Sequence, residues 1–339
     1  MENEIVTVFG GSGFIGRHVI SRLARKGSIV RVAVRDVESA KFLRTMGQVG
    51  QVVPIAADIG DEKHIASAVK GADSVINLVG ILHQSGGQNF QRIHVKGASS
   101  IASVVASEEV KNFVQVSAIG ANSNSESVYA RTKAAAEQSV MEHFAHTTII
   151  RPSVIFGPED NFFNMFARIS RISPILPVLG CPTIPKMKFF KGGFPMAINF
   201  FGNGGTRFQP VYVGDVADVV MMAITDPKLR GQTYELGGPK VYNFKELMEL
   251  MLTIMGRKKL LVPMPFWYLH IFGFLLGLLP NPMLTTDQVK LLYYDNVVSN
   301  KAQGLDDLGI SPTPLEIVLP NYLDRFKSRS NKVYPGSTI

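Results

Sequence analysis

The sequence predicts an α/β protein in which a doubly wound parallel sheet is followed by a smaller carboxy-terminal α/β lobe. Over the first 150 residues, short and continuously apolar runs alternate with longer segments that have apolar residues at helical spacing. Continuous apolar runs are typical of strands buried on both faces, and their alternation with helices indicates parallel strands joined by crossovers. A chain of 339 residues with 46% hydrophobic residues has enough material for a large core and an appended lobe.

Each element of the predicted sheet follows from its local pattern. The strands are short apolar runs, expected at residues 5–9, 29–34, 52–56, 74–79, 113–116 and 147–151. The helices between them are expected at residues 14–26, 62–70, 89–107 and 129–144. After about residue 155 the periodicity weakens, and strand–helix order returns at residues 211–225 and 233–255.

Evenly spaced glycines follow the first predicted strand and open the first predicted helix. Gly10, Gly13 and Gly16 form a G-x-x-G-x-x-G pattern within VFGGSGFIG. Glycines in this context permit a tight turn and bring a pyrophosphate close to the helix N-terminus, whose N–H groups and dipole favour negative charge. The sequence therefore predicts a Rossmann-type NADP(H)-binding domain at residues 1–155, an interleaved carboxy-terminal α/β lobe at 156–327 and a flexible tail at 328–339.

The end of the second predicted strand indicates which nicotinamide cofactor is bound. VRVAVRD places Arg35 where NAD-binding proteins tend to have an acidic residue for the ribose hydroxyls. An arginine there can form charge-assisted, bidentate bonds to a 2′-phosphate, which favours NADP(H). Asp36 follows immediately and keeps NAD open, and an Arg35 that only points to water is the alternative without a ligand.

Two further strand ends are expected to line the cofactor. Asp58, after the third strand, suits a contact with the adenine edge, with Ile59 beside the ring. Val79 and Gly80 end the fourth strand, where the backbone can pass close to a ribose. Ligands of doubly wound sheets bind outside the carboxyl ends of the strands, so the value of these residues is their position.

A tyrosine and a lysine share one face of the helix expected at residues 129–144. Tyr129 and Lys133 are four residues apart, so the lysine can bond the nicotinamide ribose and lower the pKa of the phenol for general acid–base work. A packed tyrosine beside a solvated lysine is the alternative interpretation.

The composition excludes several other classes of protein. A single cysteine, Cys181, excludes a disulfide framework and indicates a reduced compartment. His64, His83 and His94 lack the spacing of metal ligands, so no metal site is expected. No secretory signal is visible at the amino terminus.

The positive charge of the chain is concentrated in one segment. Lys and Arg number 35 against 27 Asp and Glu, a net charge of +8, and residues 161–214 contain no acidic residue. The cations of this segment, interleaved with phenylalanines such as Phe162, Phe163, Phe166, Phe200 and Phe201, are Arg168, Arg171, Lys186, Lys188, Lys191 and Arg207. Near an anionic membrane each cation contributes about 1 kcal/mol, and the aromatic residues can enter the interface. Nucleic-acid binding would use a similar mixture of residues, but we expect a membrane or an acidic partner instead. A solvated loop is the alternative.

A second apolar segment has two possible roles. Residues 266–279, FWYLHIFGFLLGLL, form a stretch of 14 residues without charge, bounded by Pro265 and Pro280. The stretch is too short to cross a hydrocarbon core, which needs about 20 helical residues. It is either a core helix or a helix at a membrane interface, where Trp267 and Tyr268 suit the headgroup boundary.

Taken together, GGSGFIG, Arg35, Tyr129 with Lys133, RPSVIFGPED and PVYVGDVA resemble the short-chain dehydrogenase/reductase superfamily in its extended or atypical branch. That superfamily usually has Ser or Thr after the fifth strand to hold the substrate oxygen. Here Ala118 falls at that position, and Ser117 lies one residue earlier. Tyr129 and Lys133 would then serve only to hold the nicotinamide ribose, and they are catalytic residues only if the protein is an active enzyme. The cofactor contacts that the resemblance implies are Gly10, Ser12, Gly13, Phe14, Ile15, Gly16, Arg35, Asp58, Ile59, Val79, Gly80, Ser117, Tyr129, Lys133 and Pro152.

The resemblance narrows towards the carboxy terminus. FGPEDNFFN, LTTDQVKLLYYDNVV and LGISPTPLEIVLPNYL are similar to the nucleotide-binding accessory subunits of respiratory complex I and their bacterial homologues. This implies a mainly structural NADPH and docking on other complex I subunits near the membrane and quinone region. The implied location is peripheral, on the cytoplasmic face of a bacterial inner membrane or the matrix side of a mitochondrial one. The alternatives are an NADP-dependent reductase or epimerase that acts on a hydrophobic substrate through Tyr129 and Lys133, and an NADPH-sensing regulatory protein.

Overall fold

The computed structural model describes residues 4–182, 186–189, 195–280 and 282–327, which form two compact units. Unit 1 comprises the chain up to Ser153 together with Val213–Gly237 and Val298–Pro312, and unit 2 comprises Val154–Tyr212, Gly238–Val297 and the chain from Thr313. The division at residue 153 lies near the expected domain boundary at 155. Two later segments, however, belong to unit 1, because the strand Thr233–Leu236 pairs with Thr148–Pro152 of the first sheet. The expected tail at 328–339 lies outside the described residues.

Unit 1 is built on a parallel sheet of seven strands in the order β13-β6-β5-β4-β1-β2-β3. Its strands are β1 (Ile5–Phe9), β2 (Ile29–Val34), β3 (Val52–Ala56), β4 (Ser74–Asn77), β5 (Asn112–Val116), β6 (Thr148–Pro152) and β13 (Thr233–Leu236). The α-helices are α1 (Phe14–Arg25), α2 (Glu62–Val69), α3 (Gly97–Ser107), α4 (Val128–His143) and α6 (Val213–Thr225). The predicted doubly wound α/β fold is therefore confirmed.

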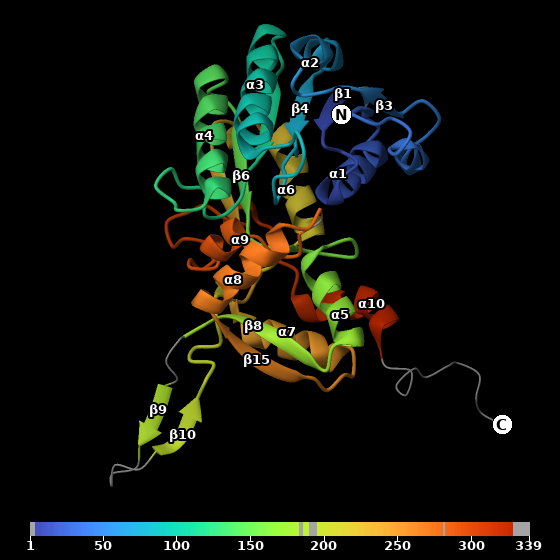
Figure 1. Cartoon of the computed structure of the whole chain (residues 1–339). Helices are drawn as coiled ribbons and strands as arrows, with labels where there is room; N and C mark the ends of the chain where they lie inside the picture. Colours follow the sequence, from blue (N-terminus) through green and yellow to red (C-terminus); the bar gives the residue numbers. More distant parts are fainter. Residues whose placement is uncertain (1–3, 183–185, 190–194, 281, 328–339) are drawn as a thin grey trace, which may run out of the picture. The chain divides into compact units, whose positions relative to one another are not determined.

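Helices cover both faces of this sheet (Figure 1). Helices α2, α3 and α4 share one apolar core with β1, β4 and β5, and α1 packs against α6. Short helical turns complete the unit: the 3₁₀ turns η1 (Lys41–Met46), η3 (Pro227–Leu229) and η4 (Asp306–Leu308), and the π-helical turn η2 (Gln91–Lys96). The pattern of buried apolar positions explains why the expected and observed helices agree to within one or two residues, except at residues 89–107.

Two local differences from the expected elements have visible causes. The fourth strand ends at Asn77 rather than at Val79, because the Asn77 side chain accepts a hydrogen bond from the Val79 N–H at 3.0 Å and turns the chain. The helix expected over 89–107 begins with the π-helical turn Gln91–Lys96, which inserts one residue into the helical ladder before α3.

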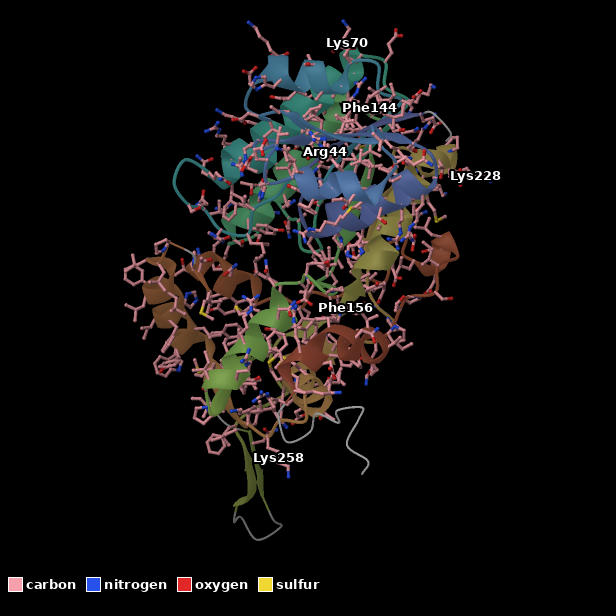
Figure 2. All side chains as sticks on the ribbon, turned by 90° about the vertical axis from the view of Figure 1, so that its right-hand side faces the viewer. Arg44, Lys70, Phe144, Phe156, Lys228 and Lys258 are labelled. Carbon is pink, nitrogen blue, oxygen red and sulfur yellow. The ribbon has the colours of Figure 1, made fainter. Side chains whose placement is uncertain are left out.

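Unit 2 encloses its own hydrophobic core. It contains β7 (Ile155–Phe156), α5 (Phe162–Ile172), β8 (Ile175–Cys181), β9 (Lys186–Phe189), β10 (Pro195–Asn199), β11 (Arg207–Phe208), β12 (Val211–Tyr212), β14 (Tyr242–Asn243), α7 (Phe244–Ile254), β15 (Leu260–Pro265), α8 (Phe266–Gly277), α9 (Thr286–Leu291), α10 (Leu315–Leu323) and the 3₁₀ turn η5 (Asp324–Phe326). The strands form two-stranded pairs, of which β8 with β15 is the longest and is parallel. Phe144 and Phe156 are both labelled in Figure 2: Phe156 is buried in the core of unit 2, and the partly buried Phe144 packs against the core of unit 1.

The core of unit 2 contains aromatic residues that the sequence analysis assigned to a docking surface. Phe163 and Phe166 are buried, and Phe162 packs against the same cluster with its ring edge-to-face on Phe244. The assignment is wrong for these three rings, because α5 turns its phenylalanine-bearing face towards α7. Of the other two named aromatics, Phe200 is exposed, whereas Phe201 is partly buried against the same core. The same acid-free segment also contains Phe190 and Phe194, which lie outside the described residues.

Candidate functional site

The glycine loop has the conformation that a phosphate-binding turn requires. Gly10, directly after β1, has φ +76°, a left-handed value that favours glycine, and its carbonyl accepts a hydrogen bond from the Gly13 N–H at 3.1 Å. Gly13 is the N-cap of α1, and no side chain caps the helix. The first turn also contains no acidic residue, so its N–H groups remain available to an anion.

The third glycine of the motif allows the helix to approach the loop. A Cβ placed on Gly16 would lie 2.3 Å from the carbonyl oxygen of Gly11, a backbone atom that cannot rotate away. A Cβ on Gly11 would lie 2.6 Å from Val32 Cγ1 on β2. Ser12, Phe14 and Ile15 are partly exposed around this turn, as expected for residues that contact a ligand.

The turn after β2 places Arg35 at the surface and engages its acidic neighbour. Asp36 Oδ1 accepts hydrogen bonds from the backbone N–H groups of Glu38 at 3.0 Å and Ser39 at 3.2 Å, and Ser39 Oγ donates to the Asp36 carbonyl at 3.0 Å. Asp36 thus organises its own turn. Arg35 is exposed beside it, at the edge where β1 and β2 run in register.

The side chains after β3, expected to line the cofactor, make contacts within the protein. Asp58 Oδ1 accepts the Gly60 N–H at 2.8 Å, and Asp58 Oδ2 lies 3.7 Å from an Arg92 nitrogen. Ile59 is buried, and its side chain packs so closely on Gly97 of α3 that a Cβ there would lie 2.5 Å from Ile59 Cδ1. Asp58 remains partly exposed at the strand end, whereas Ile59 contributes chiefly to the core.

The ends of β4 and β5 converge on the amine of Lys133. A Cβ on Gly80 would lie 3.2 Å from Lys133 Nζ, and the amine donates to the Val116 carbonyl at 3.4 Å. Ser117 follows Val116, and its buried hydroxyl has no hydrogen-bond partner among the described residues. Pro152 ends β6, the strand beside β5, and its carbonyl accepts a hydrogen bond from the Ile119 N–H at 3.0 Å. A buried, unsatisfied hydroxyl beside a buried amine fits a polar ligand group at this point.

Burial sets the protonation of the tyrosine–lysine pair. Lys133 is only 5% exposed, and burial lowers the pKa of its amine to about 8, although the charge of Glu137 opposes this shift. Burial raises the pKa of Tyr129 to about 12. This shift is opposite in direction to the lowering expected from Lys133, because the loss of hydration around Tyr129 dominates.

A histidine that the sequence analysis set aside holds this site together. His94 Nε2 accepts a hydrogen bond from the Ile81 N–H at 3.1 Å, and Nδ1 lies 3.1 Å from Thr132 Oγ1 on α4. Burial first, and then the charge of Lys133, lower the pKa of His94 to about 3, so the ring is neutral with its proton on Nδ1.

The rings around Tyr129 form a small aromatic cluster. The Tyr129 ring meets Phe90 edge-to-face at a centroid distance of 5.8 Å and His94 at 5.4 Å. The π-helical turn that contains His94 has no signal in the spacing of apolar residues, and a polar residue on a buried helix face was the only available clue. His94 thereby ties the loop after β4 to the helix that contains Tyr129 and Lys133.

The fold and the glycine loop define a class of protein. Residues 6–237 match the NAD dependent epimerase/dehydratase family, and the chain belongs to that family. The predicted resemblance to short-chain dehydrogenases of the extended branch is thereby confirmed.

The chain is similar over nearly its whole length to subunits of a respiratory enzyme. The chain is 30% identical over 335 residues to the mitochondrial NADH-ubiquinone oxidoreductase 40 kDa subunit of Neurospora crassa, covering 98% of this chain and 82% of that protein. It is 34% identical over 326 residues to the mitochondrial NADH dehydrogenase (ubiquinone) 1 alpha subcomplex subunit 9 of Mus musculus, covering 96% and 81%. The predicted similarity to complex I accessory subunits is confirmed.

Other relatives match a smaller part of the chain, and the solved structures have lower sequence identity. The ceramide reductase of Caulobacter vibrioides is 31% identical over 156 residues, covering 46% of this chain and 48% of that protein. MoeE5 in complex with UDP-glucose and NAD superposes with a TM-score of 0.66 at 15% identity, over 94% of this chain and 97% of that chain. The NADPH-dependent quinone oxidoreductase QOR2 of Escherichia coli gives a TM-score of 0.68 at 16% identity, over 93% and 99%. At these identities the solved structures show the fold alone.

Within the described residues, none of the helices combines the length and apolar character needed to cross a membrane. In the same part of the chain, no cluster of three or more His, Cys, Asp or Glu side chains could hold a metal ion.

Proposed function

We propose that the protein is an NADPH-binding accessory subunit of an NADH:quinone oxidoreductase, in which the cofactor is mainly structural. The observation that carries this proposal is the similarity to two respiratory subunits over 96–98% of the chain. That similarity extends through unit 2, well beyond the residues shared with the wider family. A subunit role therefore accounts for the whole chain rather than for its nucleotide-binding half.

The residues at the strand ends fit NADP(H). Gly10 to Gly16 and the uncapped start of α1 suit the pyrophosphate, and the Lys133 amine with the Ser117 hydroxyl suits the nicotinamide ribose. Arg35 is exposed where a 2′-phosphate would lie, while Asp36 is engaged in its own turn. When bound, such a cofactor supplies hydride exchange at its nicotinamide ring.

Two features support a structural rather than a catalytic role. Tyr129 packs edge-to-face against Phe90 and His94, and its pKa is raised to about 12, which opposes ionisation of the phenol to a general base. Ala118 offers no hydroxyl where reductases of this superfamily hold the substrate oxygen. The second candidate function, reduction or epimerisation of a hydrophobic substrate, is favoured by the presence of both Tyr129 and Lys133.

Tyr129→Phe separates these functions. We expect the variant to keep its NADP(H) affinity within about tenfold, because packing of the ring is retained and the lost hydroxyl contributes about 0.5–1.5 kcal/mol at most. It should also still assemble with its partner subunits. Cofactor titration and native-gel assembly assays check this. If the wild type oxidises NADPH with a carbonyl substrate and Tyr129→Phe abolishes that turnover, the reductase function is correct.

Unit 2 carries an apolar surface suited to the face of a membrane. Trp267 and Phe274 of α8 are 55% and 62% exposed, and Leu278, the C-cap of the helix, is 72% exposed. Ile271 and Leu275 lie on the same side of the helix. Such a contiguous apolar stripe is unusual on a monomer and is typical of interaction sites. The 12-residue helix is about 18 Å long, so it would lie in the interface rather than span the membrane.

We propose an anionic lipid surface as the occupant of this stripe. No charged residue occurs between Lys259 and Asp287, and Lys258, Lys259 and Lys290 flank the stretch in the sequence. Lys258 is exposed on unit 2 (Figure 2). Arg207 is paired with Asp295 at 2.7 Å, so it adds little net charge, and Arg168 on α5 is exposed. A protein bound to lipid through this helix would be peripheral, on the cytoplasmic face of a bacterial inner membrane or the matrix side of a mitochondrial one.

Trp267 reports directly on this contact, because it is the single tryptophan of the chain. Vesicles of phosphatidylglycerol that contain brominated lipids should quench its emission, and neutral vesicles should do so less strongly. Phe274→Asp should weaken vesicle binding at least tenfold, since burial of a phenylalanine contributes about 1.5–3 kcal/mol. Ile317→Asp, at an exposed apolar position on α10, is the matched control and should bind normally. If the Trp267 emission does not change when anionic vesicles are added, the lipid proposal is wrong and a protein partner would have to cover the stripe.

A further inference from the structure

Arg17 directly follows the last glycine of the phosphate loop, and two contacts hold its side chain. Its guanidinium carbon lies 4.8 Å from the centroid of the Phe42 ring, a cation–π contact. Its Nε donates to the Ser12 carbonyl at 3.4 Å. Of the five N–H donors of the guanidinium, the remaining four are not used by any described residue, so they are available to a ligand.

Phe42 connects Arg17 to the end of β2. The ring belongs to η1, which follows the turn that begins at Arg35. Strands β1 and β2 are paired in register, with Phe9 opposite Ala33, so the glycine loop and Arg35 emerge side by side. The stacked guanidinium of Arg17 therefore lies between the first turn of α1 and the segment that follows Arg35.

The charges around these two arginines are unbalanced. In the described part of the chain, neither Arg17 nor Arg35 makes an ion pair with a carboxylate. The nearby acids are engaged elsewhere, since Asp36 accepts from its own turn and Glu38 pairs with Lys41 at 2.5 Å. Because no described carboxylate neutralises either guanidinium, both positive charges remain available to a dianionic group.

We infer that Arg17 is a second determinant of cofactor specificity, which binds the 2′-phosphate together with Arg35. Phe42 positions its planar fork, so little conformational freedom is lost when the phosphate oxygens accept its hydrogen bonds. This inference rests on the proposed NADP(H) function and deepens it. It assigns the preference for NADP(H) to a residue in α1, outside the turn after β2 that the sequence analysis identified.

Binding of NADPH and NADH to the full-length protein tests the inference. Arg17→Gln should weaken NADPH binding about 10- to 100-fold, the effect of losing a charged hydrogen bond. It should change NADH binding less than threefold, because NADH lacks the 2′-phosphate. Arg17→Lys, which retains the charge but loses the fork, should fall between these values. Arg44→Gln removes an exposed cation from η1, the turn that contains Phe42 (Arg44 is labelled in Figure 2), and should change neither affinity by more than threefold.

The outcomes separate the inference from the proposed cofactor. A wild type that binds NADH as tightly as NADPH contradicts the proposed cofactor itself. A wild type that prefers NADPH, with a preference that survives Arg17→Gln, overturns the role of Arg17 alone. Equal losses for both cofactors, measured on a variant with an unchanged melting temperature, also overturn it and give Arg17 a structural role in the loop.

Discussion

Gly16→Ala should abolish cofactor binding and destabilise unit 1. The new methyl carbon would lie 2.3 Å from the Gly11 carbonyl oxygen and 2.5 Å from the Gly11 carbonyl carbon, which are backbone atoms that cannot rotate away. The loop must move, at a cost of about 3 kcal/mol, the upper range for overpacking. Because the N–H groups that face the pyrophosphate move with it, NADP(H) affinity should fall more than 100-fold. Thermal unfolding and cofactor titration measure the two effects.

Gly87→Ala is the control for this substitution. A Cβ on Gly87 meets no atom within 4 Å, so both stability and affinity should stay close to wild type. Equal effects of the two substitutions, or an unchanged NADP(H) affinity in Gly16→Ala, would contradict a pyrophosphate at this loop.

Lys133→Met should stabilise the cofactor-free protein while weakening cofactor binding. Burial lowers the Lys133 pKa from 10.5 to about 8, so the unfolded chain holds the proton more tightly than the folded one. The charged amine thus costs up to about 3 kcal/mol below pH 8. This cost is relieved as the pH rises from about 8 to 10.5. Methionine fills the space without a charge and removes both the cost and its pH dependence.

The same substitution removes a donor for the nicotinamide ribose. NADP(H) affinity at pH 7 should fall about 10- to 100-fold, as expected for the loss of a charged hydrogen bond. Denaturant unfolding between pH 7 and 10 and cofactor titration measure the opposed effects. Lys70→Met, at an exposed lysine (Figure 2), should change neither quantity. A Lys133→Met protein that is less stable at pH 7 and binds NADP(H) normally would exclude a role for the amine in binding.

The elements of unit 1 were predictable because their signals are local. The strands Ile29–Val34 and Val52–Ala56 have their expected bounds, since each is a short apolar run between polar turns. The glycine loop was equally clear, because Gly10 and Gly16 are required by conformation and close approach. The addition of β13 to the sheet has no local signal, as it depends on pairing with a strand more than 80 residues earlier.

The candidate site was predictable in its parts but not in its environment. The spacing of Tyr129 and Lys133 placed them on one helix face, but it does not show how far that face is removed from water. Burial therefore shifts their pKa values further apart than expected. His94 and Arg17 were missed because their roles depend on contacts with Thr132 and Phe42, which lie 38 and 25 residues away in the sequence. Likewise, helical spacing in α5 gave a phenylalanine stripe without showing that it faces the core.

Isolation of the protein from its native membrane tests the central claim most directly. The protein is extracted in a mild detergent, separated by size under native conditions and located alongside the NADH:quinone oxidoreductase activity. The proposed function predicts that it migrates with a large assembly that carries this activity, with NADP(H) recoverable from the same fraction. A protein that migrates alone, away from that activity, would contradict its role as a subunit.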